Sequence, residues 1–345
     1  MIITLQRPPR GIALMVVMIA IFVLAVMAGA FAYSMKVETK LAMNVQNETA
    51  DIWLGRSGVE VARWTLAQQM SCPYVSLNQK WAGGTGDDCD TNGPLADISL
   101  DNFQLNGRRI AITIRDLERK FNINTADPSV LQQALIHMGV DASEIPSITD
   151  AILDWIDPNA DSNVKRVNGA KSDYYQSLTP PYYAKNGPID DLSELLLVRG
   201  ITSDIYWGPA SPNHAPAAFQ QVDRFGRPTQ EPNYPVGLVD LFTPFSSGRI
   251  NLNTASADVL QLIPGVDENI AEIIVQQREQ APYHTVNELQ VPPQILPQLQ
   301  RLGDVRSQTF EVEVTVEGAN RKFYAVLKRN NPRDIQVLSF YWKDL

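Results

Sequence analysis

A continuous run of 25 residues without a charged side chain, residues 11–35, constrains this chain more than any other feature. About 20 apolar residues in a helix cross the hydrocarbon core of a bilayer, so the run is long enough to span a membrane. Arg7 and Arg10 precede the run, and positive charge ahead of an apolar helix keeps that end in the cytoplasm. The rest of the chain is therefore expected on the far side of the membrane.

Three simpler interpretations of the run compete with this one. A cleaved secretory signal has a shorter apolar core and a small-x-small cleavage site, whereas Ala28-Gly29-Ala30 lies deep inside this run. A buried helix of a soluble protein seldom lacks a polar face over six turns. A signal anchor that is never cleaved also fits the run. The pattern favours a helix that stays in the membrane.

The residues at which the charged leader meets the apolar run indicate the class of protein more specifically. The sequence Arg10-Gly11-Ile12-Ala13-Leu14-Met15 resembles the class III signal of type IV pilins and pseudopilins. In that family a prepilin peptidase cuts after the glycine and the new first residue, here Ile12, is methylated. The retained helix first anchors the protein and later forms the core of a filament. The fifth residue after the cut is normally glutamate, but here it is Val16. The K-type minor pseudopilin of type II secretion systems characteristically lacks this glutamate.

The net charge of the chain argues against one class of function, nucleic-acid binding. The chain of 345 residues has a net charge of −9, and an acidic body repels the phosphates of nucleic acids.

The two cysteines, Cys72 and Cys89, both follow the apolar run and are expected in an oxidising compartment. A disulfide between them would stabilise the fold by about 3 kcal/mol. Two buried free thiols are the alternative.

A helical pattern continues beyond the apolar run. Apolar residues recur every three to four positions at Val37, Leu41, Val45, Ile52, Val59 and Leu66. One long helix is therefore expected from the apolar run to about residue 70, ending before Cys72 and Pro73. Residues 71–101 are expected to form a loop.

Alternating apolar residues predict strands at both ends of the remaining chain. These strands lie at residues 109–116, 309–317, 322–328 and 335–342, and they flank a mostly helical block, residues 117–305. The predicted fold class is α+β: a long pilin-like N-terminal helix packed on a small antiparallel sheet, with a large helical insertion. The K-type pseudopilin, which this organisation resembles, is distinguished by such an insertion.

The insertion contains an internal repeat. Asn122-Ile123-Asn124-Thr125-Ala126 recurs as Asn251-Leu252-Asn253-Thr254-Ala255, at an offset of 129 residues. We expect repeat units near residues 121–160 and 250–290, with Thr125 and Thr254 as N-caps of the helices that follow. Residues 158–190 and 206–237 are rich in Pro, Asn, Gly and Tyr and are expected to be surface loops.

The second repeat leads into a segment that resembles a helix-hairpin-helix (SAM-like) unit. Its hairpin residues are Pro264, Gly265 and Val266. In DNA-binding versions of the motif a second glycine follows the hydrophobic residue, but Asp267 stands there, followed by Glu268. Because a carboxylate repels phosphate, the hairpin is interpreted as a structural joint between two helices.

A group of oxygen-bearing residues forms a candidate calcium site. Their spacing resembles the first ligands of a calcium loop, although neither the bend glycine nor the bidentate glutamate of an EF-hand is in place. The resemblance to the K family also implies calcium in this domain. The candidate ligands are Asp154, Asp157, Asn159, Asp161, Asn163 and Asp173. The alternative is a solvated turn capped by its own Asx side chains.

The sequence gives no reason to propose an enzyme. His137, His214 and His284 belong to no recognisable metal or nucleophile motif. The chain also lacks a nucleophile elbow, a phosphate-binding loop and a dinucleotide fingerprint.

Together these features identify a chain similar to the K-type minor pseudopilins. The implied segments are a leader (1–11), a membrane and filament helix (12–35), a pilin-like part (36–116), the insertion (117–305) and C-terminal strands (306–345). The resemblance implies a bacterial inner-membrane protein with a periplasmic body, which starts the secretion pseudopilus in a tip complex with the I- and J-type minor pseudopilins. Further implied partners are the prepilin peptidase, the major pseudopilin, the inner-membrane assembly platform and secreted cargo. The alternatives are a membrane-anchored DNA-binding protein and a minor pilin of a type IV pilus.

Overall fold

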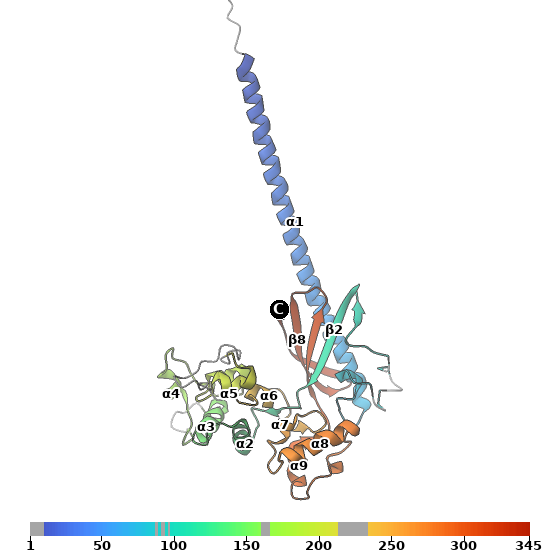
Figure 1. Ribbon diagram of the computed structural model, residues 1–345, viewed down its shortest axis with the longest axis vertical. Helices are drawn as coiled ribbons and strands as arrows, with labels where there is room; N and C mark the ends of the chain where they lie inside the picture. Colours follow the sequence, from blue (N-terminus) through green and yellow to red (C-terminus); the bar gives the residue numbers. More distant parts are fainter. Residues whose placement is uncertain (1–9, 87–88, 91–93, 96, 160–165, 213–233) are drawn as a thin grey trace, which may run out of the picture. The chain divides into compact units, whose positions relative to one another are not determined.

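The structure is a computed structural model that describes residues 10–86, 89–90, 94–95, 97–159, 166–212 and 234–345, with side chains from Ala13 onward. The chain divides into two compact units, Met1–Arg56 and Ser57–Leu345. Helix α1, Arg10–Gln68, begins in the first unit and ends in the second (Figure 1). Its 59 residues confirm the prediction of one helix that continues from the apolar run to about residue 70.

The first unit exposes most of the apolar side chains that the structure describes, although Leu54 is buried. Every residue from Ala13 to Ala50 is exposed, and the large hydrophobic ones include Leu14, Phe22 and Phe31. Among the described residues, α1 is the one helix long and apolar enough to cross a membrane. Such a surface is unfavourable in water, so it needs lipid or other apolar helices around it.

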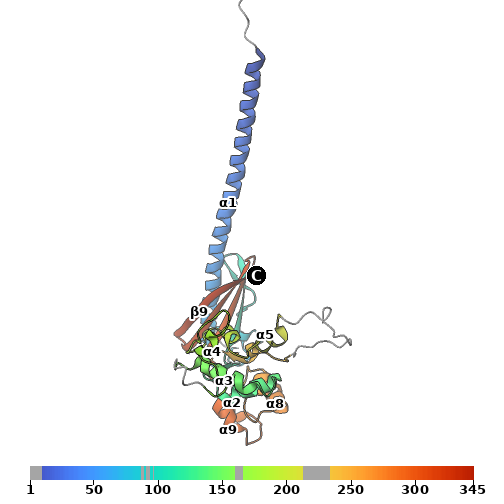
Figure 2. The ribbon, with the colours of Figure 1, turned by 90° about the vertical axis from the view of Figure 1, so that its left-hand side faces the viewer.

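The second unit is built on a five-stranded antiparallel sheet. The strands are β1 (Phe103–Leu105), β2 (Arg108–Asp116), β7 (Thr309–Val316), β8 (Arg321–Asn331) and β9 (Asp334–Asp344), in the order β1-β2-β7-β8-β9. Ile112 of β2 lies opposite Val314 of β7, which in turn lies opposite Phe323 of β8. The four predicted strands are therefore present, with β8 and β9 longer than predicted; Figure 2 shows the long β9.

The last three turns of α1 pack on this sheet. Val59, Ala62 and Leu66 are buried on the helix, as is Val314 on β7. A Cβ atom at Gly58 would lie 2.6 Å from Cγ1 of Val314, so glycine lets the helix pack this closely on the sheet. The predicted apolar stripe therefore divides in two: its members from Val59 onward are core, whereas Val37, Leu41 and Val45 are exposed.

The insertion lies between two neighbouring strands of the sheet, because β2 and β7 pair although residues 117–308 separate them. Its first part contains β3 (Phe121–Asn122), α2 (Pro128–Met138), α3 (Ile145–Ile156), α4 (Ser172–Gln176), η3 (Leu192–Leu197), α5 (Ser203–Trp207), η4 (Gly208–Ala210), α6 (Leu238–Leu241) and β4 (Phe242–Thr243). Its second part contains β5 (Ile250–Asn251), α7 (Ala257–Leu260), α8 (Glu268–Gln280), η6 (Val286–Glu288), α9 (Leu296–Leu302) and β6 (Gly303–Asp304).

We call these two parts the first repeat (121–243) and the second repeat (250–304). They have the same construction. Each begins with a two-residue strand that pairs in parallel with the two-residue strand at its end, β3 with β4 and β5 with β6. Each then closes with one more bond, from the amide of Ile123 to the Thr243 carbonyl and from that of Leu252 to the Asp304 carbonyl. The duplication thus extends well beyond the recurring Asn-x-Asn-Thr-Ala segment.

The second asparagine of each segment explains why these residues recur. The side-chain amide of Asn253 accepts from the Tyr283 amide and donates to the Tyr283 carbonyl, both at 2.9 Å. Asn124 makes the same pair of bonds to Ile189, at 2.7 and 3.0 Å. Each asparagine side chain therefore makes the two bonds that a neighbouring strand would make, to backbone groups that would otherwise be unpaired.

Two local predictions were wrong. Thr125 and Thr254 are not N-caps: α2 begins after Asp127, α7 is capped by Ser256, and the Thr254 hydroxyl instead donates to Asp116. Residues 158–190 are also not simply a surface loop, because Tyr175 is fully buried there. Composition indicates a lack of regular structure, but it does not distinguish exposed from buried loops.

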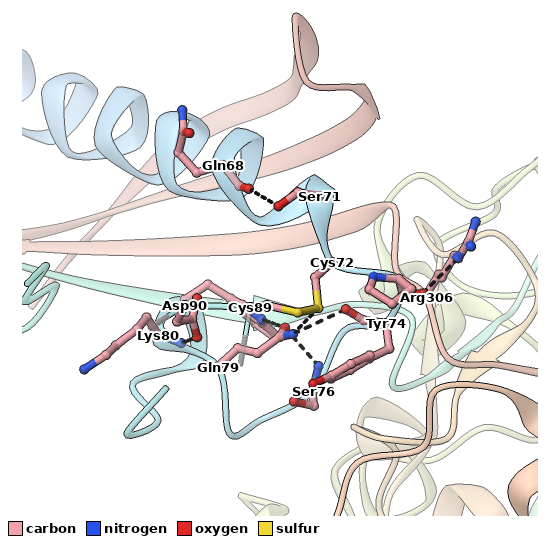
Figure 3. The surroundings of a disulfide bond; sticks show 12 residues. Gln68, Ser71, Cys72, Tyr74, Ser76, Gln79, Lys80, Cys89, Asp90 and Arg306 are labelled. Carbon is pink, nitrogen blue, oxygen red and sulfur yellow. Dashed lines mark hydrogen bonds between the residues drawn. A yellow bond between two sulfur atoms is a disulfide. The ribbon is translucent and has the colours of Figure 1, made fainter. Parts of the chain in front are cut away.

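The predicted disulfide joins Cys72 and Cys89, whose Cα atoms lie 5.7 Å apart. Beside it, the buried Gln79 side chain donates to Sγ of Cys72 (Figure 3). The same side chain accepts from the Trp81 indole. The disulfide thus ties Cys89 to the segment after α1, which the Gln79 side chain itself holds together.

Replacing both cysteines by serine is expected to lower the free energy of unfolding by about 3 kcal/mol, because the open loop gains entropy in the unfolded state. Urea denaturation of the full chain in detergent, followed by tryptophan fluorescence, measures this loss. A reducing agent should reproduce it in the wild-type chain and leave the double variant unchanged. A loss below about 1 kcal/mol would show that the disulfide contributes little.

Candidate functional site

The predicted processing site lies at the start of α1. Gly11 and Ile12 are helical in the backbone, while their side chains lie outside the described part. Val16 is exposed and presents an isopropyl group where a glutamate would present a charge. Cleavage after Gly11 and methylation of Ile12 stay predictions.

The second hairpin joins α7 to α8 at Pro264-Gly265-Val266. Gly265 has a φ of +90°, a conformation that other residues rarely adopt, and Val266 is buried beneath the turn. Asp267 then caps α8, because its carboxylate accepts from the amide of Ile270 at 2.9 Å. The carboxylate occupies the helix N-terminus where a phosphate would bind, so this hairpin does not favour nucleic-acid recognition.

The first repeat contains a matching hairpin that sequence reasoning missed. Gly139, with a φ of +84°, precedes the buried Val140 and then Asp141, repeating the Gly-Val-Asp of the second hairpin. Asp141 accepts from the amide and hydroxyl of Ser143, and these bonds hold the pKa of its carboxyl below the usual value. The recurring Gly-Val-Asp could have revealed this hairpin. Its offset between the repeats differs slightly from the 129 residues that separate the two Asn-x-Asn-Thr-Ala segments.

The insertion is joined to the sheet by a buried carboxylate at the end of β2. Oδ2 of Asp116 accepts from the hydroxyls of Thr254 and Ser307, both at 2.6 Å, and from the side-chain amide of Asn251 at 3.1 Å. Oδ1 accepts from the amide of Glu118 at 2.8 Å. Burial raises the pKa of the Asp116 carboxyl, while these donors oppose that rise. We call Asp116, Asn251, Thr254 and Ser307 the junction cluster.

Neighbouring groups extend the junction cluster to α1. The buried guanidinium of Arg329 donates to the carbonyls of Leu66 and Ser307. Burial lowers the pKa of Arg329 to about 10, and the charge of Asp116 acts in the opposite direction. Burial also raises the pKa of Glu118, which accepts from Ser247 in the link between the two repeats. The long helix, the sheet and the second repeat thus meet around one polar core.

The described calcium candidates do not gather into a ligand set. Asp154 is fully buried and pairs with Arg166 at 2.9 Å, whereas Asp157 accepts from the amide of Asn159 in an Asx turn. Asp173 is exposed at the start of α4. Among the described residues, no three His, Cys, Asp or Glu side chains lie close enough together to hold a metal ion. Asp161 and Asn163 lie outside these residues, so calcium binding stays a prediction.

The described histidines have structural contacts. His137 of α2 contacts Asp258 of α7 at 3.0 Å and thus bridges the two repeats. His284 stacks on Tyr74 with ring centroids 4.5 Å apart. His214 lies outside the described residues. These contacts give each described histidine a role in packing.

Comparisons with known proteins agree on one family. Residues 110–207 match the family model "Type II secretion system (T2SS), protein K", and residues 246–299 match the helix-hairpin-helix motif. The chain is 28% identical over 220 residues to type II secretion system protein K of Aeromonas hydrophila, covering 58% of this chain and 61% of that protein. It is 26% identical over 246 residues to the protein of the same name from Pectobacterium carotovorum, covering 64% and 66%. The chain thus covers slightly less than two thirds of these relatives' lengths.

A solved structure shows the same fold. It is the crystal structure of the GspK-GspI-GspJ complex from the type 2 secretion system of enterotoxigenic Escherichia coli, in which one chain matches with a TM-score of 0.63. The match covers 88% of this chain and 99% of that chain at 19% sequence identity. This likeness confirms the α+β fold, with its long helix, antiparallel sheet and helical insertion.

Proposed function

Because the chain belongs to the family of type II secretion system protein K, we propose that it is a minor pseudopilin rather than an enzyme. The observation that carries this proposal is α1, which combines a charge-free run long enough to span a membrane with residues that pack on the sheet. Such a helix suits a subunit that is first anchored in the inner membrane, with its body in the periplasm, and later packs its apolar helix among others in a pseudopilus.

The proposed role within that assembly is to form its tip together with minor pseudopilins of the I and J types. The similar structure from E. coli is that of a complex between GspK, GspI and GspJ. Val16 supports a terminal position, because an isopropyl group cannot pair with the charged N-terminus of a neighbouring subunit. The tip would start assembly on the inner-membrane platform, receive the major pseudopilin beneath it and contact secreted cargo.

Processing by a prepilin peptidase tests this proposal. In cells that contain the peptidase, we expect a mature chain that begins at methylated Ile12, detected by N-terminal sequencing and intact mass. Gly11→Leu should remain uncut, since the cut requires that glycine. Gly29→Leu is the matched control and should be cut normally, because a Cβ atom at Gly29 meets nothing within 4 Å.

Two other outcomes would contradict the proposal. A chain that keeps Met1 in the presence of the peptidase would be a simple anchored protein, and a cut near Ala30 would indicate a secreted one. Failure of the processed chain to co-purify with its cognate I- and J-type pseudopilins would overturn the tip assignment while leaving the pseudopilin assignment in place. Processing and co-purification therefore test separate parts of the proposal.

A further inference from the structure

The segment after α3 contains a lysine whose side chain is buried. Lys171 is only 1% exposed and lies immediately before α4. Removing an ammonium group from water is costly unless oxygen atoms replace its hydration shell. The surroundings of Lys171 must therefore supply those oxygens.

Three oxygen atoms from two segments surround the ammonium group. Nζ of Lys171 donates to the carbonyl of Asn159 at 2.8 Å, to the carbonyl of Asp157 at 3.3 Å and to Oδ1 of Asn186 at 3.3 Å. Backbone carbonyls and Asn side chains are also the neutral oxygens that a calcium loop offers to its ion. The ammonium group thus binds two backbone carbonyls of the turn in which the sequence predicted calcium.

A second cationic side chain neutralises the buried carboxylate of the same segment. Asp154 accepts from the backbone amide of Arg166 at 3.2 Å and from its guanidinium at 2.9 Å. A Cβ atom at Gly169 would collide with Oδ2 of Asp154, so the backbone of this segment lies directly against the carboxylate. The carboxylate of Asp154, one of the candidate calcium ligands, is therefore already paired with a cation of the chain itself.

We propose that the Lys171 ammonium takes the place of a metal ion at the carbonyls of Asp157 and Asn159, and that the described residues around it, 154–159 and 166–186, fold without calcium. The Asn124–Ile189 interval is 35 residues longer than the Asn253–Tyr283 interval of the second repeat, and Arg166 and Lys171 lie between α3 and Ile189. The additional segment of the first repeat therefore brings its own positive charges. This inference is independent of the tip assignment.

The first test compares calcium chloride with a calcium chelator on the full chain in detergent. An ion bound only by the folded state raises the melting temperature by several degrees at saturation. We expect a difference below about 1 °C, within the scatter of such measurements. Hydrogen exchange of the peptide 153–159 should likewise be the same under both conditions. A rise of several degrees, or stronger protection of this peptide in calcium, would overturn the proposal.

The second test removes the ammonium group. Lys171→Met keeps most of the side-chain volume but removes the donor that these three oxygen atoms share, so we expect a melting temperature lower by several degrees and faster exchange in the peptide 153–159. Lys328→Met, at an exposed lysine of β8, is the matched control and should change neither. If Lys171→Met exchanges like the wild type, the ammonium does not hold the turn. If this variant fails to fold, the calcium comparison on the wild-type chain still decides.

Discussion

Asp116→Ala is expected to lower the free energy of unfolding by about 5 kcal/mol, the largest effect of the single substitutions proposed, because four buried donors lose their bond to its carboxylate. These donors belong to Asn251, Thr254, Ser307 and the amide of Glu118. The loss would separate the second repeat from the end of β2. Urea denaturation of the full chain in detergent measures it, with the buried Trp81 and Trp155 as fluorescent reporters.

Two controls define the origin of this effect. Asp116→Asn keeps the shape of the side chain and one acceptor oxygen, so its loss should be smaller, about 2 kcal/mol. Asp101→Ala changes an exposed aspartate in the turn before β1 and should stay within about 0.5 kcal/mol of the wild type. An Asp116→Ala variant as stable as Asp101→Ala would mean that the junction cluster does not hold the insertion to the sheet.

Asn253→Ala is expected to cost about 4 kcal/mol, since both backbone groups of Tyr283 lose their partner at a buried position. Asn253 and Tyr283 are only 2% and 5% exposed, so water cannot replace the amide without opening the second repeat. The same denaturation experiment measures the loss. The exposed Asn102 supplies the control, and Asn102→Ala should leave stability unchanged.

The first repeat offers an internal comparison. Asn124 makes the same two bonds to Ile189 but is only partly buried, so Asn124→Ala should destabilise less than Asn253→Ala. Because the two asparagines have no shared partner, the double variant should lose the sum of the two single losses. An effect of Asn253→Ala no larger than that of Asn102→Ala would refute the equivalence of the repeats.

The duplication illustrates how far sequence reasoning reached inside the insertion. The Asn-x-Asn-Thr-Ala segments were found because identical residues recur at one constant offset. The sequence did not match the hairpin of one repeat to that of the other, or Ile189 to Tyr283. Insertions of different length separate these residues from the Asn-x-Asn-Thr-Ala segments. The wrong capping role of Thr254 has a related cause: Ser256 caps α7, and the Thr254 hydroxyl donates to Asp116, which is distant in the chain.

The candidate calcium site is a second example in which the sequence pattern could not decide between two structures. Alternating oxygen-bearing residues after an apolar helix are consistent both with a cation site and with an Asx turn. Nothing in the spacing indicates that Arg166 pairs with Asp154, or that Lys171 turns inward to the carbonyls of Asp157 and Asn159. The choice between a metal ion and a side-chain cation depends on these contacts.

The sequence by itself determined the features that depend on local order along the chain. These are the charge-free run, the long helix, the alternating strands, the cysteine pair and the recurring asparagines. Hydrophobic periodicity and side-chain type act over a few residues, so they can be read without knowing the fold. Only the tertiary structure decided that β2 pairs with β7 across the insertion, that Asp116 joins the sheet to the second repeat, and that Lys171 is buried. Such contacts join residues far apart in sequence, and the free energy of burial that selects them depends on the whole packed unit.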